Sequence, residues 1–264
     1  MSQQEEKLSG GNVSQVYRVE NTVRREIKPE SERIHKLLKH LEEKGFSHAP
    51  RFMGIDEKGR EMLSYLNGEA GNYPLKSYMW SDEVLIDIAK MLRGYHDAVS
   101  DFPFEEEWEP LDDTPGPYEF ICHNDFAIYN IIFHNKQVAG IIDFDVAAPG
   151  PRVWDVAYAL YTCVPLGVGH LDENGEAVYY EAGRDAHLRK ERIDLFFKAY
   201  GMEHLKEGIV DVVKRRVQAL QSTMKRKAAE GDEAFQRMID EGHYDHYERE
   251  LAFIKREGHR WVEE

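Results

Sequence analysis

The chain has 264 residues, 42% hydrophobic and 31% charged, which is typical of one or two globular domains with a substantial core. Its formal net charge of −15 argues against nucleic acid and anionic membranes as partners, because a chain this acidic repels both. No apolar run approaches the roughly 20 residues of a membrane span, and the polar N-terminus lacks the pattern of a signal peptide. We therefore expect a cytoplasmic protein, with Cys122 and Cys163 as free thiols.

Residues 1–67 are predicted to form a small β-sheet with one helix. Short apolar runs separated by turn residues indicate the strands. Between two of these runs, apolar residues recur at the spacing of one helix face, and Gly45 follows them. The predicted strands are 13–19, 22–27, 50–55 and 61–66, and the predicted helix runs from 31 to 44.

Residues 68–264 have a different pattern, in which helical periodicity dominates. Two short apolar strands interrupt it, and residues 101–117 are rich in acids and proline, which favours a loop. The predicted strands are 131–133 and 138–142, and the predicted helices begin near 82, 154 and 189. We therefore expect an α+β fold with a small N-terminal sheet lobe (1–67) and a larger, mostly helical C-terminal lobe (68–264).

Three polar residues flank the predicted hairpin of residues 131–142. Asp125 and Asn130 precede its first strand, and Asp143 ends its second. A hairpin brings such positions together, and carboxylate and amide oxygens are the ligands that Mg²⁺ prefers. The other carboxylate, Asp125, can orient a substrate hydroxyl and accept its proton. Phosphoryl transfer needs mainly this positioning and charge neutralisation from a protein.

The spacing His123-Asn124-Asp125-x-x-x-x-Asn130, followed by Ile142-Asp143-Phe144-Asp145, resembles the aminoglycoside phosphotransferase and choline kinase superfamily. This superfamily is a relative of the protein kinases. The resemblance implies a protein-kinase-like fold and transfer of the γ-phosphoryl group of ATP, or of GTP, to a hydroxyl of a small acceptor. Asn124 departs from the family pattern, since glycine is usual there.

The resemblance also assigns roles to single residues. It implies that Asp125 is the catalytic base, that Asn130 and Asp143 bind Mg²⁺, and that His123 is structural. Asp145 and Asp155 are expected to support the site. Asp155 lies in Trp154-Asp155-Val156-Ala157, which looks like the family's segment opening a C-lobe helix, and is expected to support the catalytic loop or to cap that helix.

The nucleotide side matches the family less well. The run containing Gly10, Gly11, Asn12 and Ser14 looks like the phosphate-covering loop, although Gly-Gly is equally a plain turn. The third strand of a kinase-like lobe usually carries a lysine that contacts the phosphates.

Here that strand carries arginines. Arg24 fits the position of the lysine best, and Arg25 is expected on the opposite face. An arginine can grip phosphate but is not equivalent to lysine. The helix glutamate that pairs with the lysine is not evident, and His35 either replaces it or is an ordinary half-buried histidine.

The hinge between the lobes is expected at Ser64, Tyr65 and Leu66, whose backbone would bind adenine. The family's acceptors are mostly small hydroxyl compounds, many of them cationic, such as aminoglycosides and choline. Two acidic stretches, 101–113 and 230–250, either bind ammonium groups or form a solvated face. Four aromatic residues either form a cation–π site or belong to the core: Trp154, Tyr158, Tyr161 and Tyr244.

Two other functions are compatible with parts of the pattern. The missing lysine is compatible with a non-catalytic, nucleotide-binding protein with a regulatory role, and an Arg24 side chain that points away from Asp143 would favour it. A metallohydrolase built on His123, Asp125, His134 and Asp143 is a weaker alternative, because neither histidine has a familiar ligand spacing.

Overall fold

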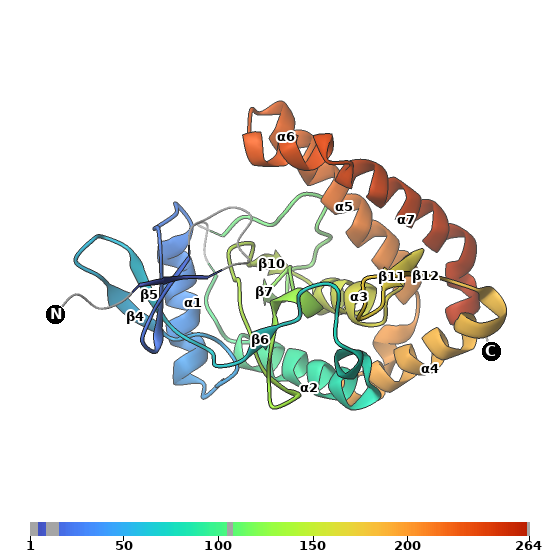
Figure 1. Ribbon diagram of the computed structural model, residues 1–264, viewed down its shortest axis with the longest axis horizontal. Coiled ribbons are helices and arrows are strands. Elements are labelled where there is room, and N and C mark those ends of the chain that lie inside the picture. The colour runs from blue at the N-terminus through green and yellow to red at the C-terminus, as the bar shows by residue number, and fades with distance from the viewer. Residues whose placement is uncertain (1–4, 9–15, 105–107, 263–264) are drawn as a thin grey trace.

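The computed structural model describes residues 5–8, 16–104 and 108–262. A small sheet lobe and a larger helical lobe lie side by side along the long axis of the molecule (Figure 1). The N-terminal sheet has five antiparallel strands in the order β1-β2-β3-β5-β4. Its strands are β1 (Glu6–Lys7), β2 (Tyr17–Val19), β3 (Thr22–Arg25), β4 (Phe52–Ile55) and β5 (Glu61–Ser64).

One helix, α1 (Ser31–Glu43), accompanies this sheet. Its apolar side chains recur every three or four residues and are buried, whereas its charged residues face solvent. Lys44 and Gly45 follow the helix, and Gly45 has the left-handed backbone (φ +75°) that commonly ends one. The sheet and single helix predicted for residues 1–67 are therefore confirmed in the part of the chain that the structure describes.

Two short sheets join the lobes and hold the catalytic segments. In one, β8 pairs with both β6 and β9; in the other, β7 pairs with β10. The strands are β6 (Glu69–Ala70), β7 (Phe120–Cys122), β8 (Ile131–His134), β9 (Gln137–Ile141) and β10 (Ala148–Gly150). The hairpin of β8 and β9 was predicted. The β7–β10 pair was not, because each strand has only three residues and its partner lies far along the chain.

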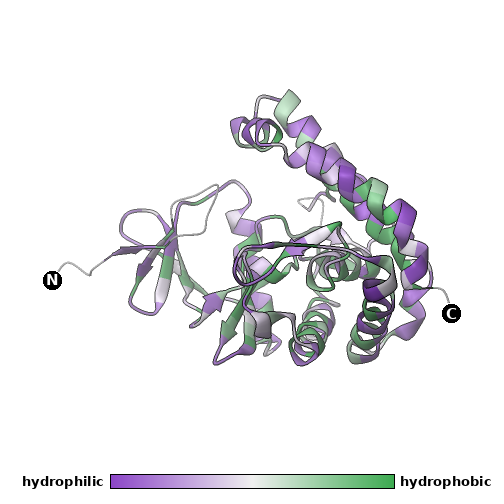
Figure 2. Cartoon of the chain, turned by 45° about the vertical axis from the view of Figure 1, so that its right-hand side comes forward, coloured by the Kyte–Doolittle hydropathy of each residue, from purple (hydrophilic) through white to green (hydrophobic). Residues whose placement is uncertain are grey.

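The C-terminal lobe is built from six helices. α2 packs on α4, and α3 on α5, while α5, α6 and α7 form an arm at one edge of the molecule (Figure 1). Apolar residues gather where the helices face one another, and polar residues cover the outside (Figure 2). The helices are α2 (Asp82–Ala98), α3 (Arg152–Cys163), α4 (Ala182–Tyr200), α5 (Ile209–Ala229), α6 (Glu233–Asp240) and α7 (His243–Glu257).

Short elements connect these helices. A hairpin of β11 (Gly169–Leu171) and β12 (Ala177–Tyr179) precedes α4, which begins earlier than the predicted position near 189. The 3-10 turns are η1 (Ser77–Trp80), η2 (Ile128–Asn130), η3 (Glu203–Lys206) and η4 (Gly258–Trp261). Among the described residues, no helix is both long and apolar enough to cross a membrane.

Candidate active site

The loop that carries the predicted catalytic motif, residues 123–130, begins where β7 ends, and we call it the catalytic loop. Asn124 has a left-handed backbone conformation (φ +61°), which glycine adopts freely and asparagine tolerates better than most residues. Its side-chain amide donates to the carbonyl oxygens of Val146 and Ala148, at 3.3 and 3.2 Å. The asparagine in place of the usual glycine therefore fits the backbone and adds two hydrogen bonds to the neighbouring segment.

Asp155, in the first turn of α3, binds the backbone of the catalytic loop. Its fully buried carboxylate accepts the backbone N–H groups of His123 and Asn124, both at 2.7 Å, and also His96 Nε2 at 3.2 Å. Burial alone raises the pKa of Asp155, but His96 and the backbone donor lower it overall, so the carboxylate is held charged. The structure thus places Asp155 under the catalytic loop, in contact with its backbone.

His123 is a neutral ring in the core of this loop. Its Nδ1 accepts the backbone N–H of Asp125 at 3.2 Å, so its Nε2 carries the proton and donates to the Ile142 carbonyl at 3.2 Å. Complete burial lowers the pKa of His123 to about 4. The ring connects the catalytic loop to the end of β9, which is a structural position.

Both oxygens of the Asp125 carboxylate accept hydrogen bonds. Tyr129 donates its hydroxyl to Oδ1 at 2.6 Å, and the Asn130 amide donates to Oδ2 at 2.7 Å. Burial raises the pKa of Asp125 to about 6, the Tyr129 hydroxyl lowers it, and the Asp143 charge raises it. A carboxylate with a pKa in this range is ionised near neutrality and can still take up a proton. Tyr129 was not singled out by the sequence, since a tyrosine next to a motif residue carries no signal by itself.

Asp143 lies beside Asn130 because β8 and β9 pair. The backbone oxygen of Asn130 accepts the N–H of Ile142 at 3.0 Å, and Asp143 follows with a left-handed backbone (φ +65°). Its side chain is 51% exposed. Removal from water and the neighbouring Asp145 charge raise the pKa of Asp143. Asp125, Asn130 and Asp143 are therefore brought together at the junction of the lobes, as the motif spacing predicted.

On the N-lobe side, Arg25 and Lys28 face the aspartates. Arg25 lies 2.7 Å from Asp145 and 4.0 Å from Asp143, and Lys28 Nζ lies 2.6 Å from Asp145. Burial raises the pKa of Asp145, but both cations outweigh it and hold that pKa below its usual range. These cations lie where a kinase-like lobe uses positive charge to contact phosphates.

The position expected for Arg24 needs correction. Arg24 points to the other face of β3, where it pairs with Asp56 at 3.7 Å, and its neighbour Arg25 faces Asp143. Successive residues of a strand face opposite sides, so a register one residue away exchanges the roles of Arg24 and Arg25. Arg25 also donates to the buried Glu61 of β5, and His35 of α1 donates to that carboxylate at 2.5 Å. The carboxylate partner thus comes from a strand, and His35 contacts it instead of replacing it.

The three predicted hinge residues, Ser64, Tyr65 and Leu66, differ in whether their backbone N–H groups already have an acceptor. The N–H of Ser64 donates to the Arg51 carbonyl, and the N–H of Tyr65 donates to the Asn21 carbonyl, both at 2.9 Å. Within the described part of the chain, the Leu66 N–H takes part in no such backbone hydrogen bond. Leu66 is therefore the residue of the three whose N–H can meet a ligand. The predicted phosphate-covering residues Gly10, Gly11, Asn12 and Ser14 lie outside the described residues.

Several of the candidate acceptor residues have partners inside the protein. Asp101 pairs with Lys44, Asp112 with Arg226, and Glu250 accepts the N–H of Val168. The rings of Trp154 and Tyr158 are buried against Arg216, Tyr161 donates its hydroxyl to Glu250, and Tyr244 is half-buried. Trp154 and Tyr158 thus contact a cation that belongs to the chain itself.

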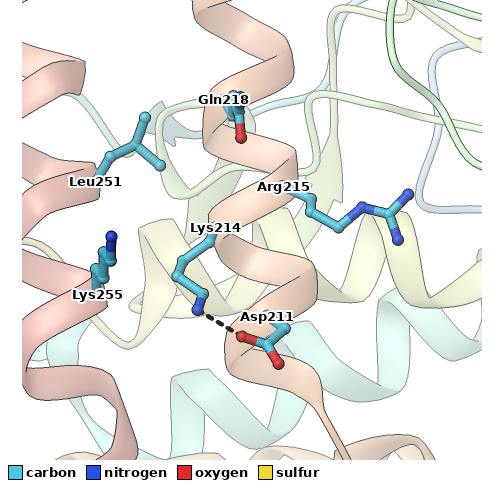
Figure 3. Close-up of a pocket in the computed structure, with 6 residues that line it drawn as sticks. All are labelled: Asp211, Lys214, Arg215, Gln218, Leu251 and Lys255. Carbon is cyan, nitrogen blue, oxygen red and sulfur yellow. Dashed lines mark ion pairs between the residues drawn. The ribbon is translucent and has the colours of Figure 1, made fainter.

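The structure also bears on the metallohydrolase alternative, and it contains a hollow between two C-lobe helices. Among the described residues, no group of three or more His, Cys, Asp or Glu side chains could hold a metal ion, so the metallohydrolase alternative gains no support there. A hollow of about 530 Å³ lies between α5 and α7, and none of the residues that line it is among those expected to act in phosphoryl transfer (Figure 3). It is lined by Asp211, Lys214, Arg215, Gln218, Leu251 and Lys255.

Comparison with known proteins gives the family. Residues 79–188 match the model of the phosphotransferase enzyme family. A trifolitoxin immunity protein of Rhizobium leguminosarum bv. trifolii is 31% identical over 208 residues, which cover 76% of each chain. The chain therefore belongs to the phosphotransferase enzyme family, and the superfamily expected from the sequence is confirmed.

Solved structures share the fold at low sequence identity. The amicoumacin kinase hAmiN, in complex with AMP-PNP and Ca²⁺, has a TM-score of 0.62 at 12% identity, covering 90% of this chain and 88% of its own. An aminoglycoside 2'-phosphotransferase-IIIa in its GDP complex has a TM-score of 0.60 at 16% identity, covering 96% and 94%. The kinase-like α+β fold is confirmed, and the family agrees with the expected class, a phosphotransferase.

Proposed function

We propose that this chain transfers the γ-phosphoryl group of ATP or GTP to a hydroxyl of a small molecule, with Asp125 as the catalytic base. One observation carries the proposal. Asn130 donates its side-chain amide to Asp125, and its backbone oxygen accepts the N–H of Ile142, next to Asp143. One residue thus holds the base and the metal-binding segment in a fixed relation, which is the positioning that phosphoryl transfer requires.

The donor set fits a hard divalent cation such as Mg²⁺. The Asn130 nitrogen is used toward Asp125, and no described residue donates to its Oδ1. Asp143 is half exposed, and its single ion pair among the described residues is the 4.0 Å contact with Arg25. Asn130 and Asp143 would hold the ion, which would neutralise charge on the nucleotide phosphates. The complexes of amicoumacin kinase with Ca²⁺ and AMP-PNP, and of the aminoglycoside enzyme with GDP, support this use of metal and nucleotide.

Each residue of the site has its own role in the proposed reaction. Asp125 accepts the proton of the acceptor hydroxyl as the new oxygen–phosphorus bond forms, since its carboxylate is ionised near neutrality and remains basic. Arg25 and Lys28 contact the nucleotide phosphates from the N-lobe. The backbone N–H of Leu66 contacts the base of the nucleotide. Asp155 and His123 hold the loop that carries Asp125.

The acceptor is proposed as a class. The similarity to a trifolitoxin immunity protein, together with the fold shared with aminoglycoside and amicoumacin kinases, supports an antibiotic or toxin that carries hydroxyl groups. Choline-like and ethanolamine-like compounds form a second set, since an ethanolamine kinase of Plasmodium vivax shares the fold with a TM-score of 0.58. Arg24 points away from Asp143, and this orientation favours the regulatory alternative. Arg25 faces Asp143 in its place and can supply the positive charge that the phosphates need, which supports the enzymatic function.

The test is a screen of these compounds with MgATP and MgGTP, with nucleoside diphosphate release as the readout. Acceptor-dependent release is expected, and Asp125→Ala should lower it by about 10²- to 10⁴-fold, the range for loss of a general base. Asp172→Asn, in the exposed turn between β11 and β12, is the matched control and should keep wild-type turnover. Full turnover by Asp125→Ala would contradict the assignment of the base, and nucleotide binding without turnover on any acceptor would favour the regulatory alternative.

A further inference from the structure

Arg216 of α5 is buried beneath the catalytic loop. Its side chain is only 3% exposed and donates to the backbone carbonyl of Asn124 at 2.5 Å. Its guanidinium also lies over the rings of Tyr158 at 4.6 Å and Trp154 at 5.6 Å. Trp154 and Tyr158 were candidates for a cation–π site, and the cation that they contact is thus Arg216 of the protein itself.

This guanidinium has few polar partners for a buried charge. Among the described residues, no carboxylate lies within ion-pair distance of it, and its Nε has no hydrogen-bond partner. Burying a charge without a paired partner is strongly unfavourable. Among the described residues, the hydrogen-bond acceptor that holds this buried cation is the carbonyl of Asn124, the residue directly before Asp125.

Arg216 is connected to Asp125 indirectly, through two sets of contacts. One is the carbonyl of Asn124, the residue directly before Asp125. The other passes through Tyr158, whose hydroxyl lies 2.8 Å from that of Tyr129, which in turn contacts Asp125. An ionised carboxylate only accepts hydrogen bonds, so Tyr129 donates to it and Tyr158 donates to Tyr129. The direction of both hydrogen bonds in this series is therefore fixed, and the Arg216 guanidinium packs against the ring of Tyr158.

We propose that Arg216 is a positioning residue for phosphoryl transfer, which fixes the orientation of Asp125 and joins the arm of α5, α6 and α7 to the catalytic loop. The role rests on the function proposed above. A misplacement of about 1 Å in a reacting group can lower a rate by about 10²-fold, so the second turn of α5 contributes to catalysis without touching substrate.

Arg215 offers a matched control in the same helix turn. It is exposed, and its guanidinium points away from Leu251 and Lys255 of α7 (Figure 3). Among the described residues, Arg215 has no hydrogen bond or ion pair with the catalytic loop. The experiment compares Arg216→Met, which keeps the apolar stem, Arg216→Lys, which keeps the charge, and Arg215→Met. The first measurement is amide hydrogen exchange in residues 121–130, without ligands. The second is turnover, separated into kcat and the KM for nucleotide.

For Arg216→Met we expect faster exchange confined to residues 121–130 and a kcat lowered by about 10- to 100-fold, with the KM for nucleotide within about twofold of wild type. Arg216→Lys should be intermediate, because an ammonium keeps the charge and loses the planar fork. Arg215→Met should match wild type in both measurements. A milder variant, Tyr158→Phe, should show the same pattern with a smaller decrease in kcat, since it interrupts one of the two sets of contacts.

Two results would overturn the inference. One is wild-type exchange and kcat in a folded Arg216→Met protein. The other is faster exchange throughout the C-lobe with kcat and KM affected together, which would mean that Arg216 only fills the core. The exchange measurement needs no acceptor, so it remains decisive for Arg216 even if the wild type proves to have no turnover, a result that would contradict the proposed function instead.

Discussion

The C-lobe side of Asp125, the proposed catalytic base, is built from buried hydrogen bonds, whereas the N-lobe side is built from ion pairs that are partly exposed. On the first side, Asp155 and His123 are completely buried and bond to the backbone of the loop. On the second side, Arg25, Lys28 and Asp145 keep some contact with solvent. Buried hydrogen bonds fix one geometry, while partly exposed ion pairs can rearrange when phosphates arrive. The comparison teaches that the proposed base is preorganised, and that the cations proposed to bind phosphate have partners that phosphate can replace.

The largest effect is expected on the buried side, for Asp155→Ala. The substitution leaves two backbone N–H groups and His96 Nε2 without their acceptor in a dry environment. Each such loss is worth about 1–3 kcal/mol, so the free energy of unfolding should fall by about 3 kcal/mol or more. Urea unfolding measures this, with Asp87→Ala on the exposed face of α2 as the control. A wild-type unfolding midpoint for Asp155→Ala would show that the loop is not held from α3.

A smaller effect, in activity, is expected on the ion-paired side. Arg25→Met removes a cation that faces Asp143 and Asp145, and should lower kcat/KM for nucleotide by about 100-fold, because it removes a charge that contacts the phosphates. Arg24→Met should stay within about twofold of wild type, since Arg24 pairs with Asp56 on the other face. Steady-state kinetics with varied nucleotide would decide between them. The reverse ranking would restore the register expected from the sequence alone.

The same division explains what the sequence could predict. The C-lobe side is encoded locally: Asp125, Asn130 and Asp143 lie on one loop and one hairpin, so their spacing places them together. The N-lobe side depends on strand register, and a shift of one residue exchanges Arg24 and Arg25. The fold class followed from a change in apolar periodicity near residue 67, and it needed no register.

Long-range partners were beyond the reach of sequence patterns. Glu61 is brought to Arg25 by the pairing of β3 with β5, and Arg216 is brought to Asn124 by the packing of α5 on α3. Neither residue belongs to a motif, and each is one charge among many on its element. Tyr129 is a different case, because the 3-10 turn η2 (Ile128–Asn130) turns its hydroxyl back to Asp125, and periodicity does not indicate such a turn.

The smallest predicted effect concerns pH and the buried side. The pKa of His123 is lowered to about 4 in the folded protein by burial, while an unfolded histidine has a pKa of about 6.5. Between these values the unfolded chain binds a proton that the folded chain does not, so the free energy of unfolding falls as the pH drops. From pH 7 to pH 5, this one residue should remove about 2 kcal/mol.

His123→Asn isolates this contribution, because the amide oxygen can accept the Asp125 N–H and does not titrate. The raised pKa of Asp125 acts in the opposite direction, since its folded form keeps a proton that the unfolded form has lost. That contribution is present in both proteins, so it cancels when their pH dependences are compared. Urea unfolding at pH 7 and pH 5 should therefore show a loss about 2 kcal/mol smaller in the variant. Equal losses would mean that His123 takes up a proton without leaving its place, and the buried side would then be less rigid than its hydrogen bonds indicate.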